Sequence, residues 1–229
     1  NRRTEMPAVC NRRASASAAA FSPRINAVPS MRKSAAMLVE SRESNIRGTW
    51  QVLEAARRAS LLKGVILAST DKVYGDQPVL PYTEESPLAA MYPYDASKLC
   101  ADILARSYAA TFDLPVTLLR CANIYGGGDV NWSRLIPGTV RSVLQGERPI
   151  IRSDGTLKRD YLYIDDAVDA YLTLGENLDR EDVRGEAFNF GWSTGHSVLE
   201  VVDAVLTGAD RTDLQPVILN EAKGEIKHQ

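Results

Sequence analysis

Tyr94 and Lys98, a tyrosine and a lysine four positions apart, are the first residues whose types and spacing could do chemistry. On a helix they share one face, one turn apart. An ammonium beside a phenol favours the phenolate and so lowers the pKa of the tyrosine. A tyrosine tuned in this way can take the proton of a substrate hydroxyl while hydride leaves the same carbon. Taken alone, the pair fits an ordinary surface helix better than an active site.

Thr70, Asp71 and Lys72 form a second polar group, directly after the apolar run GVILAS at 64–69. A short continuous apolar run is typical of a strand buried on both faces of a parallel sheet. Ligands of open α/β sheets bind beyond the carboxyl ends of the strands, which is where these three residues would lie. Two simpler interpretations stay open: a cap on the following turn for Asp71, and an outward-facing side chain for Lys72.

Three helices that could position these groups are predicted from the period of their apolar residues. They cover residues 45–59, 94–112 and 197–206. The first has an apolar face of Ile46, Trp50, Leu53 and Ala56. The second has an apolar stripe of Leu99, Ile103, Leu104, Tyr108 and Phe112. The third opens with Ser197 and Glu200, three residues apart, which is the pattern of a capping box.

Short apolar runs alternate with these helices and predict strands. They lie at 64–69, 114–120, 161–164 and 187–190. Strands that alternate with helices along the chain predict an α/β fold with a parallel sheet and right-handed crossovers. If the first two strands are neighbours, Thr70 and Asp71 face the same crevice as Asn123 and Tyr125, which follow the second strand.

The composition argues against several kinds of partner. The net charge of −2 gives no reason to expect nucleic acid, and no apolar run approaches the ~18 residues of a membrane-spanning helix. The cysteines are few, odd in number and without metal-ligand spacing: Cys10, Cys100 and Cys121. We therefore expect a cytoplasmic location, no bound metal, no membrane partner and no nucleic-acid partner.

Residues 1–44 differ from the rest of the chain. The first forty hold seven Lys or Arg against two Asp or Glu, together with Ser- and Ala-rich stretches and no clear periodicity. This composition fits a fragment or out-of-frame stretch, a disordered basic tail, or a targeting segment. We therefore divide the chain into a basic segment at 1–44 and a regular region at 45–229.

Residues 45–229 resemble the extended short-chain dehydrogenase/reductase family, the NAD-dependent sugar-nucleotide epimerases and dehydratases. The resemblance rests on stretches in one order: NIRGTWQVLEAAR, ASTDKVYGD, PYDASK, RCANIYGGGD, GTLKRDYLYIDDAVDAY and GEAFNFG. It implies a Rossmann-like doubly wound parallel sheet with a small C-terminal substrate-binding region, interleaved mainly at 126–160 and 187–229. It also implies NAD as cofactor, a nucleotide-sugar substrate and a homodimer.

The same resemblance implies roles for single residues. Thr70, Tyr94 and Lys98 match the family's catalytic Ser/Thr, Tyr and Lys, and Lys98 would also hold the nicotinamide ribose. Ser69 and Cys121, at two strand ends, would lie near the nicotinamide. The residues expected to contact the nucleotide-sugar are Asn123, Arg134, Arg159 and His228.

Asp71 and Lys72 are the residues that separate two reactions in this family. Both reactions begin by oxidising carbon 4 of the sugar, but a 4,6-dehydratase must then remove the proton at carbon 5 and expel the hydroxyl at carbon 6. Elimination needs a base and an acid, and Lys72 and Asp71 could supply them if burial shifts their pKa values. Epimerases usually carry small neutral residues here, and Asp-Lys looks most like the CDP-glucose 4,6-dehydratases.

One departure from the family is plain in the sequence. No G-x-x-G-x-x-G occurs anywhere in the chain, although this turn binds the dinucleotide pyrophosphate. We therefore expect an incomplete Rossmann-like sheet and a chain that does not hold NAD by itself. A 4,6-dehydratase lineage is the first hypothesis, a sugar-nucleotide 4-epimerase the second, and a non-catalytic sugar-nucleotide-binding module the third.

Overall fold

The computed structural model describes Val39 and residues 42–221. Its main sheet is parallel and has the strand order β1 (Val65–Thr70), β2 (Val116–Cys121) and β7 (Ala187–Phe190). The predicted α/β fold with a parallel sheet is therefore confirmed. His228 and nearly all of the basic segment at 1–44 lie outside the described residues.

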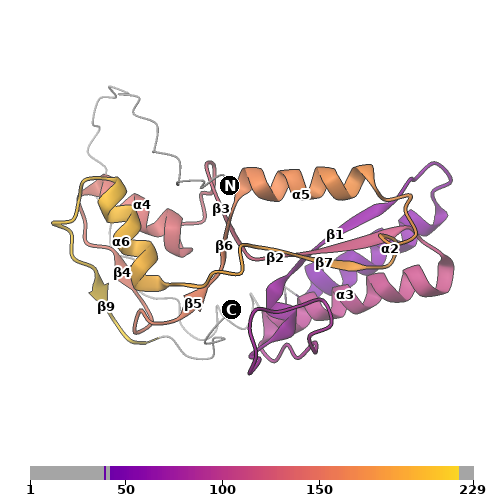
Figure 1. The fold of residues 1–229 in the computed structure, drawn as a ribbon, viewed down its shortest axis with the longest axis horizontal. Helices are drawn as coiled ribbons and strands as arrows, with labels where there is room; N and C mark the ends of the chain where they lie inside the picture. Colours follow the sequence, from indigo (N-terminus) through magenta and orange to yellow (C-terminus); the bar gives the residue numbers. More distant parts are fainter. Residues whose placement is uncertain (1–38, 40–41, 222–229) are drawn as a thin grey trace, which may run out of the picture.

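Helices cover both faces of this sheet, as Figure 1 shows. Helices α2 (Thr49–Arg58) and α3 (Pro93–Phe112) lie on one face, and α5 (Ile164–Glu176) lies on the other. The central strand β2 is buried along its whole length, and its alternate side chains enter two separate cores. Val116 and Leu118 pack toward α2 and α3, whereas Leu119 and Cys121 pack toward α5.

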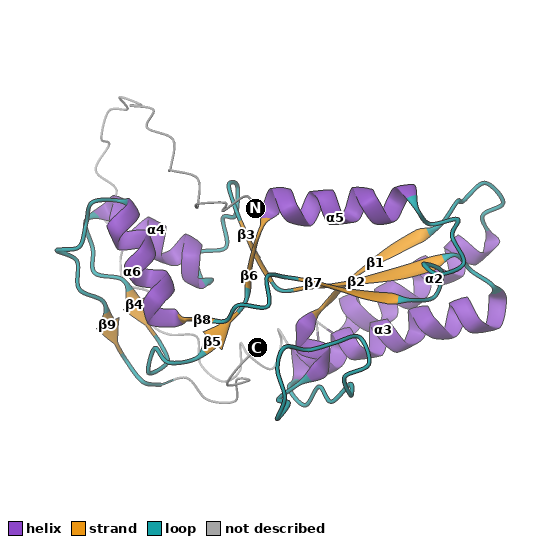
Figure 2. Cartoon of the chain, viewed as in Figure 1, coloured by secondary structure: helices purple, strands orange, loops and turns teal. Residues whose placement is uncertain are grey.

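A smaller lobe lies beyond the carboxyl end of the sheet (Figure 2). It holds α4 (Leu135–Gln145), β4 (Ile150–Ile151), α6 (Val198–Gly208) and β9 (Val217–Ile218). Its core is formed by Val143, Ile151, Val202, Leu206 and Leu214. The predicted capping box of α6 is confirmed, since Glu200 N donates to Ser197 Oγ at 3.2 Å and Ser197 N donates to Glu200 Oε2 at 2.7 Å.

Two short strand pairs lie between the main sheet and the lobe. Strand β3 (Asn123–Tyr125) pairs in parallel with β6 (Tyr161–Tyr163). Strand β5 (Lys158–Arg159) pairs antiparallel with β8 (His196–Ser197). These pairs bring the segments after β2 and before α5 to the end of the sheet where Thr70 lies.

The prediction that residues 64–69 form a fully buried strand is wrong in part. Strand β1 is only partly buried, and Ala68 is exposed. Within the described part of the chain β1 has a sheet partner on one side only, β2. A strand at the edge of a sheet has fewer neighbours to cover its side chains than a central one.

The predicted apolar face of the first helix is also wrong at Trp50, which is 52% exposed, while Leu53 is 1% exposed. A π-helical segment, Glu43–Gly48, runs directly into α2. Within the regular helix α2, Leu53 is buried and Thr49 and Ala56 are half-buried. The buried face is therefore centred on Leu53, and Trp50, three residues before it, lies at the edge of that face.

In α3 the predicted stripe is wrong at Ile103 and Phe112, which are 54% and 49% exposed. The buried face consists mainly of small and polar side chains: Asp95, Ser97, Ala101, Asp102, Ala105 and Tyr108. Small residues let α3 lie close to α2 and to the sheet, and the buried carboxylate of Asp102 has a cationic partner described below. Hydrophobic period alone does not show such a face.

None of the helices within the described residues is long and apolar enough to cross a membrane.

Candidate active site

The site begins where β1 ends, at a short 3₁₀-helix, η2 (Asp71–Tyr74). Thr70 is its N-cap, and its Oγ1 accepts a hydrogen bond from Lys72 N at 3.4 Å and donates one to Asp71 Oδ1 at 3.0 Å. A hydroxyl side chain at this position satisfies a free amide of the first turn. Thr70 and Asp71 are both buried, at 8% and 9% exposure. The local sequence thus turns the chain sharply and keeps both groups at the strand end.

Lys72 and Asn123 meet beyond the ends of two neighbouring strands. The register pairs Thr70 of β1 with Cys121 of β2, so the residues that follow each strand lie at one edge of the sheet. Lys72 Nζ donates to Asn123 Oδ1 at 3.0 Å and lies 3.6 Å from Asp71 Oδ1. The structure therefore brings Asp71 and Asn123 together, as the sequence predicts, with Lys72 between them. Tyr125, which was expected in the same crevice, instead has ring contacts with Tyr161 and Tyr163.

Tyr94 and Lys98 lie on the first turns of α3, but the structure does not couple them as the sequence suggests. Burial, and then the negative charge of Asp95, raise the pKa of Tyr94, while the positive charge of Arg134 acts in the opposite direction. Lys98 Nζ donates to the carbonyl oxygen of Ala68 at 3.0 Å, and burial lowers its pKa. The expected lowering of the Tyr94 pKa by Lys98 is wrong for this structure, because the lysine is directed to the β1 backbone.

Asp95 is a member of the site that the sequence interpretation missed. It is 6% exposed, and burial raises its pKa to about 6; the charge of Asp71 also raises it, whereas those of Lys72 and Arg159 lower it. Its position seven residues before Asp102 places both carboxylates on one face of α3. That spacing, inside the motif PYDASK, is the signal that could have identified it.

A buried polar network supports the site from below. Arg120 of β2 forms two hydrogen bonds with the Asp102 carboxylate, both at 2.9 Å, and Ser69 Oγ donates to the same carboxylate at 3.0 Å. Arg120 Nη1 donates to Tyr74 Oη at 2.7 Å, and Tyr74 in turn donates to Asn189 Oδ1 at 2.7 Å. The network therefore joins β1, α3, β2, η2 and β7 directly under Thr70 and Asp71.

A pocket of about 290 Å³ opens beside Asp71. Its polar lining includes Asp71, Tyr82, Arg120, Lys158, Asp160 and Asn189. Asp160 Oδ2 accepts a hydrogen bond from Ser193 N at 2.8 Å, and burial raises the pKa of this carboxyl. Because Asp71 is at the wall of this cavity, a small polar ligand in the pocket could contact it.

Three further predicted site residues, Cys121, Arg134 and Arg159, are not among those that line this pocket. Cys121 is buried in the core beneath α5, and burial raises the pKa of its thiol to about 11, so it is not a nucleophile at neutral pH. Arg134, the N-cap of α4, pairs with Asp129 at 3.2 Å, and its charge acts on Tyr94. Arg159 lies opposite His196 in the β5–β8 pair.

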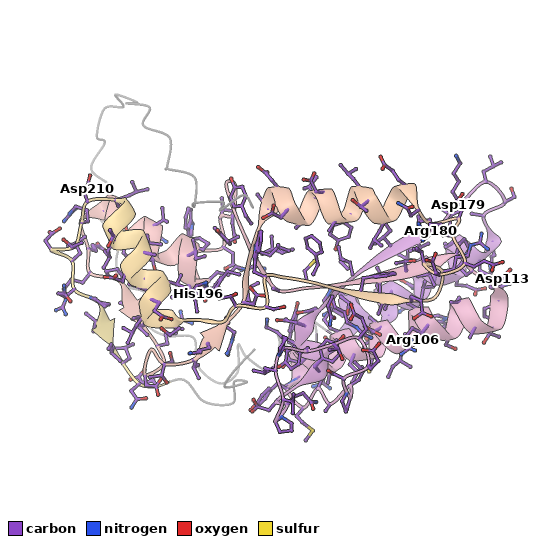
Figure 3. The ribbon with its side chains drawn as sticks, viewed as in Figure 1. Arg106, Asp113, Asp179, Arg180, His196 and Asp210 are labelled. Atoms are coloured by element: carbon purple, nitrogen blue, oxygen red, sulfur yellow. The ribbon has the colours of Figure 1, made fainter. Side chains whose placement is uncertain are left out.

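Figure 3 shows how the charged side chains are distributed along the molecule. His196 lies beside the smaller lobe, near the carboxyl end of the sheet. Arg106, Asp113, Asp179 and Arg180 lie at the opposite end. Asp71 and Lys72 follow the carboxyl end of β1, so these four charged residues lie at the other end of the sheet from them.

Comparison with known proteins agrees with this geometry. Residues 25–191 match the model of the NAD dependent epimerase/dehydratase family. The chain belongs to this family.

The chain is similar to sugar-nucleotide 4,6-dehydratases among curated relatives and solved structures. It is 35% identical over 189 residues to dTDP-glucose 4,6-dehydratase 1 of Escherichia coli, covering 75% of this chain and 50% of the relative. It is 30% identical over 193 residues to CDP-glucose 4,6-dehydratase of Salmonella typhimurium, covering 78% and 53%. The chain spans about half the length of the curated relatives it matches.

Among solved structures, the chain matches DesIV, a dTDP-glucose 4,6-dehydratase from Streptomyces venezuelae crystallised with NAD and TYD bound. The TM-score is 0.74 at 30% identity, over 89% of this chain and 62% of that chain. Sugar-nucleotide 4-epimerases are also among the matching structures. These matches confirm the Rossmann-type fold and its family, within which both kinds of reaction occur.

Proposed function

We propose that this protein is an NAD-dependent sugar-nucleotide 4,6-dehydratase. The observation that carries the proposal is the pair Asp71 and Lys72, whose Oδ1 and Nζ lie 3.6 Å apart beside Thr70 at the carboxyl end of β1. An elimination needs one group that removes a proton and another that delivers one, both close to the same two carbons. An acid and an amine fixed side by side at the ligand-binding edge of the sheet meet that need.

Tyr94, Thr70 and Lys98 are the residues that we assign to the first step, the oxidation of carbon 4. Tyr94 is 45% exposed at the start of α3 and is available to a ligand, and Thr70 lies across the end of β1 to orient the same hydroxyl. Tyr94 is assigned the removal of the hydroxyl proton as general base; because burial raises its pKa, this role needs a positive charge beside the phenol in the complex with cofactor and substrate. When bound, NAD would supply the hydride acceptor for this step and the hydride donor for the last.

The described residues fit the nicotinamide end of NAD, since Lys98 and Tyr94 offer polar groups for the nicotinamide ribose on one face of α3. They do not include a glycine-rich turn for the pyrophosphate, and no G-x-x-G-x-x-G occurs in the sequence. Activity is therefore best assayed in a version of the protein extended by a glycine-rich dinucleotide-binding segment. We call this the extended version.

The second step, loss of water across carbons 5 and 6, is assigned to Lys72 and Asp71. Lys72 removes the proton at carbon 5, which the ketone at carbon 4 makes acidic, and Asp71 gives its proton to the departing hydroxyl of carbon 6. Asp71 lines the pocket of about 290 Å³, so the hydroxyl has room to approach it. The substrate is proposed to be a nucleoside diphosphate sugar, with Arg159 and Arg134 beside its phosphates and carbon 6 of its sugar toward the pocket that Asp71 lines.

Two other functions are distinguishable from this one. A 4-epimerase would need Tyr94 and Thr70 but no acid and base at Asp71 and Lys72, so the buried carboxylate beside an amine favours the dehydratase. A non-catalytic binding module would bind a nucleotide-sugar and leave it unchanged. Lys72 favours a CDP-glucose substrate within the dehydratases, because many of the others have a glutamate at this position.

We also propose a division of the chain into two regions, a cytoplasmic location and a homodimer. The division into a basic segment at 1–44 and a catalytic region at 45–229, and a cytoplasmic location, rest on composition. A homodimer of the family type is supported by the exposed apolar side chains of Ile103 and Phe112 on α3, which a second subunit could cover.

Replacing Asp71 with asparagine tests the proposed function. In the extended version, Asp71→Asn is expected to allow oxidation of carbon 4 but to slow water loss at least ~100-fold, because an amide cannot supply the proton. Reduced cofactor should then accumulate after mixing with CDP-glucose or dTDP-glucose, which its near-ultraviolet absorbance reports.

The matched control for this experiment is Asp203→Asn, a change of the same kind on the exposed face of α6. It should leave turnover unchanged. Normal formation of the 4-keto-6-deoxy product by Asp71→Asn would remove Asp71 from the elimination and favour the epimerase.

A further inference from the structure

The side-chain amide of Asn123 has partners that fix which way it points. Its Nδ2 donates to the carbonyl oxygen of Asp160 at 3.0 Å, and its backbone N–H donates to the same oxygen at 3.1 Å. Its Oδ1 accepts from Lys72 Nζ at 3.0 Å. The reverse orientation would place Oδ1 against a carbonyl oxygen and the NH₂ group against an ammonium, and neither contact could form. Asn123 therefore presents a neutral acceptor to Lys72.

Lys72 has a competing partner in Asp71. Their closest atoms, Nζ and Oδ1, are 3.6 Å apart, which is longer than the ~2.7–2.9 Å of a direct charge-assisted hydrogen bond. The side chains of Lys72 and Asp71 are only 24% and 12% exposed, so water screens their attraction weakly. A lysine has a flexible four-carbon stem that could close this gap. The contact with Asn123 is what opposes the closure.

We propose that Asn123 is a positioning residue, which holds the Lys72 amine away from Asp71. The chemical meaning of this role rests on the proposed function. If Lys72 and Asp71 contacted each other directly, they would exchange a proton between themselves, and neither would then be free to act on the substrate. A neutral amide suits the role, since a carboxylate in its place would stabilise the protonated lysine. This role differs from the substrate contact that the family resemblance implies for Asn123.

The charges around Lys72 come from several elements. Asp71 approaches it from η2, and Asp95, which feels its charge, approaches from α3. Arg159 of β5 acts on Asp95 as well, with a positive charge. Asp160 contributes the backbone carbonyl that orients Asn123. Asn123 bonds to Lys72 directly, and Lys72 lies beside Asp71. A substitution at Asn123 is therefore expected to move the Lys72 amine, and to alter the surroundings of Asp71 through that movement.

The pKa of Lys72 in the 229-residue chain tests this role without any need for activity. It can be followed by NMR from the ¹³Cε signal of labelled lysine, assigned with a Lys72→Arg variant. Asn123→Asp is expected to raise the Lys72 pKa by at least about one unit, because a carboxylate replaces the neutral acceptor. Asn131→Asp, the same change on an exposed loop, should leave it unchanged. An unaltered Lys72 pKa in a folded Asn123→Asp chain would overturn the proposal.

A shorter side chain gives a second measurement in case the aspartate variant does not fold. Asn123→Ser is expected to free the amine, which then closes on Asp71 and lowers the pKa of that carboxyl by at least about half a unit, visible in its ¹³Cγ signal. No change at Asp71 would overturn the role.

Kinetics of the extended version then separate positioning from substrate binding. Asn123→Ser is expected to lower kcat at least 10-fold while KM for dTDP-glucose changes less than 3-fold. A raised KM with an unchanged kcat would assign Asn123 to the substrate and overturn the proposal. If the unaltered extended version has no dehydratase activity, the proposed function fails, whereas the NMR titration still decides the contact.

Discussion

Replacing Asp102 with alanine is expected to lower the free energy of unfolding by about 3–5 kcal/mol, the usual cost of leaving a buried charge without its partner. The side chains of Arg120 and Asp102 are 1% and 0% exposed, and two hydrogen bonds of 2.9 Å join them. Removing the carboxylate would leave the guanidinium buried, with Tyr74 as a remaining hydrogen-bond acceptor. Ser69 would also lose the acceptor of its hydroxyl.

Urea denaturation of the 229-residue chain measures this loss as a shift of the midpoint at constant slope. Asp213→Ala, which removes the exposed partner of Arg211, is the matched control and should change the midpoint little. A double change, Asp102→Leu with Arg120→Met, should recover much of the stability, since a well-packed apolar pair often replaces a buried ion pair. A midpoint shift no larger than that of Asp213→Ala would show that the pair does not support the core.

Replacing Asp95 with asparagine is expected to have the opposite effect on stability at neutral pH. Burial raises the pKa of Asp95 from 3.8 to about 6, so the folded protein binds a proton over a pH range in which the unfolded chain has released it. Stability is then highest below the unfolded pKa and is lost as the pH rises through about 6. A shift of this size corresponds to about 3 kcal/mol at pH 7.5, at 1.36 kcal/mol per pKa unit.

The difference in unfolding free energy between Asp95→Asn and the unaltered chain should therefore grow with pH. The variant is expected to be more stable by about 3 kcal/mol at pH 7.5 and by less than about 1 kcal/mol at pH 4. Asp113→Asn, at the exposed C-cap of the same helix, should show no such trend. A difference that stays constant between the two pH values would mean that Asp95 is not held in its protonated form by burial.

The sequence predicted the parts of the fold that depend on local pattern. Strands β2, β6 and β7 coincide with apolar or aromatic runs, and α6 begins at its predicted capping box. The edge of the sheet at which Thr70, Asp71 and Asn123 meet was predictable because parallel strands present their carboxyl ends together. The apolar pattern of α2, in contrast, did not show where the buried face ends, and Trp50 at its edge is exposed.

What the sequence could not show are contacts that join distant segments. The pairing of Asp102 with Arg120 depends on α3 packing against β2, and the position of Lys98 depends on the backbone of β1. Asp95 is buried on α3 together with Asp102, Ser97 and other small or polar residues. Counting apolar residues by helical period assigns every carboxylate to the surface. It therefore could not identify Asp95 as a buried acid with a raised pKa in the site.

The most direct test of the dehydratase assignment is the fate of the carbon 5 proton. The extended version is incubated in D₂O with CDP-glucose and, separately, with dTDP-glucose, and the product is identified by NMR. If Lys72 and Asp71 carry an elimination, the product is a 4-keto-6-deoxy sugar with one deuterium at carbon 5, because that carbon loses its proton and regains one from solvent. Formation of the carbon 4 epimer with no deuterium at carbon 5 would contradict the assignment.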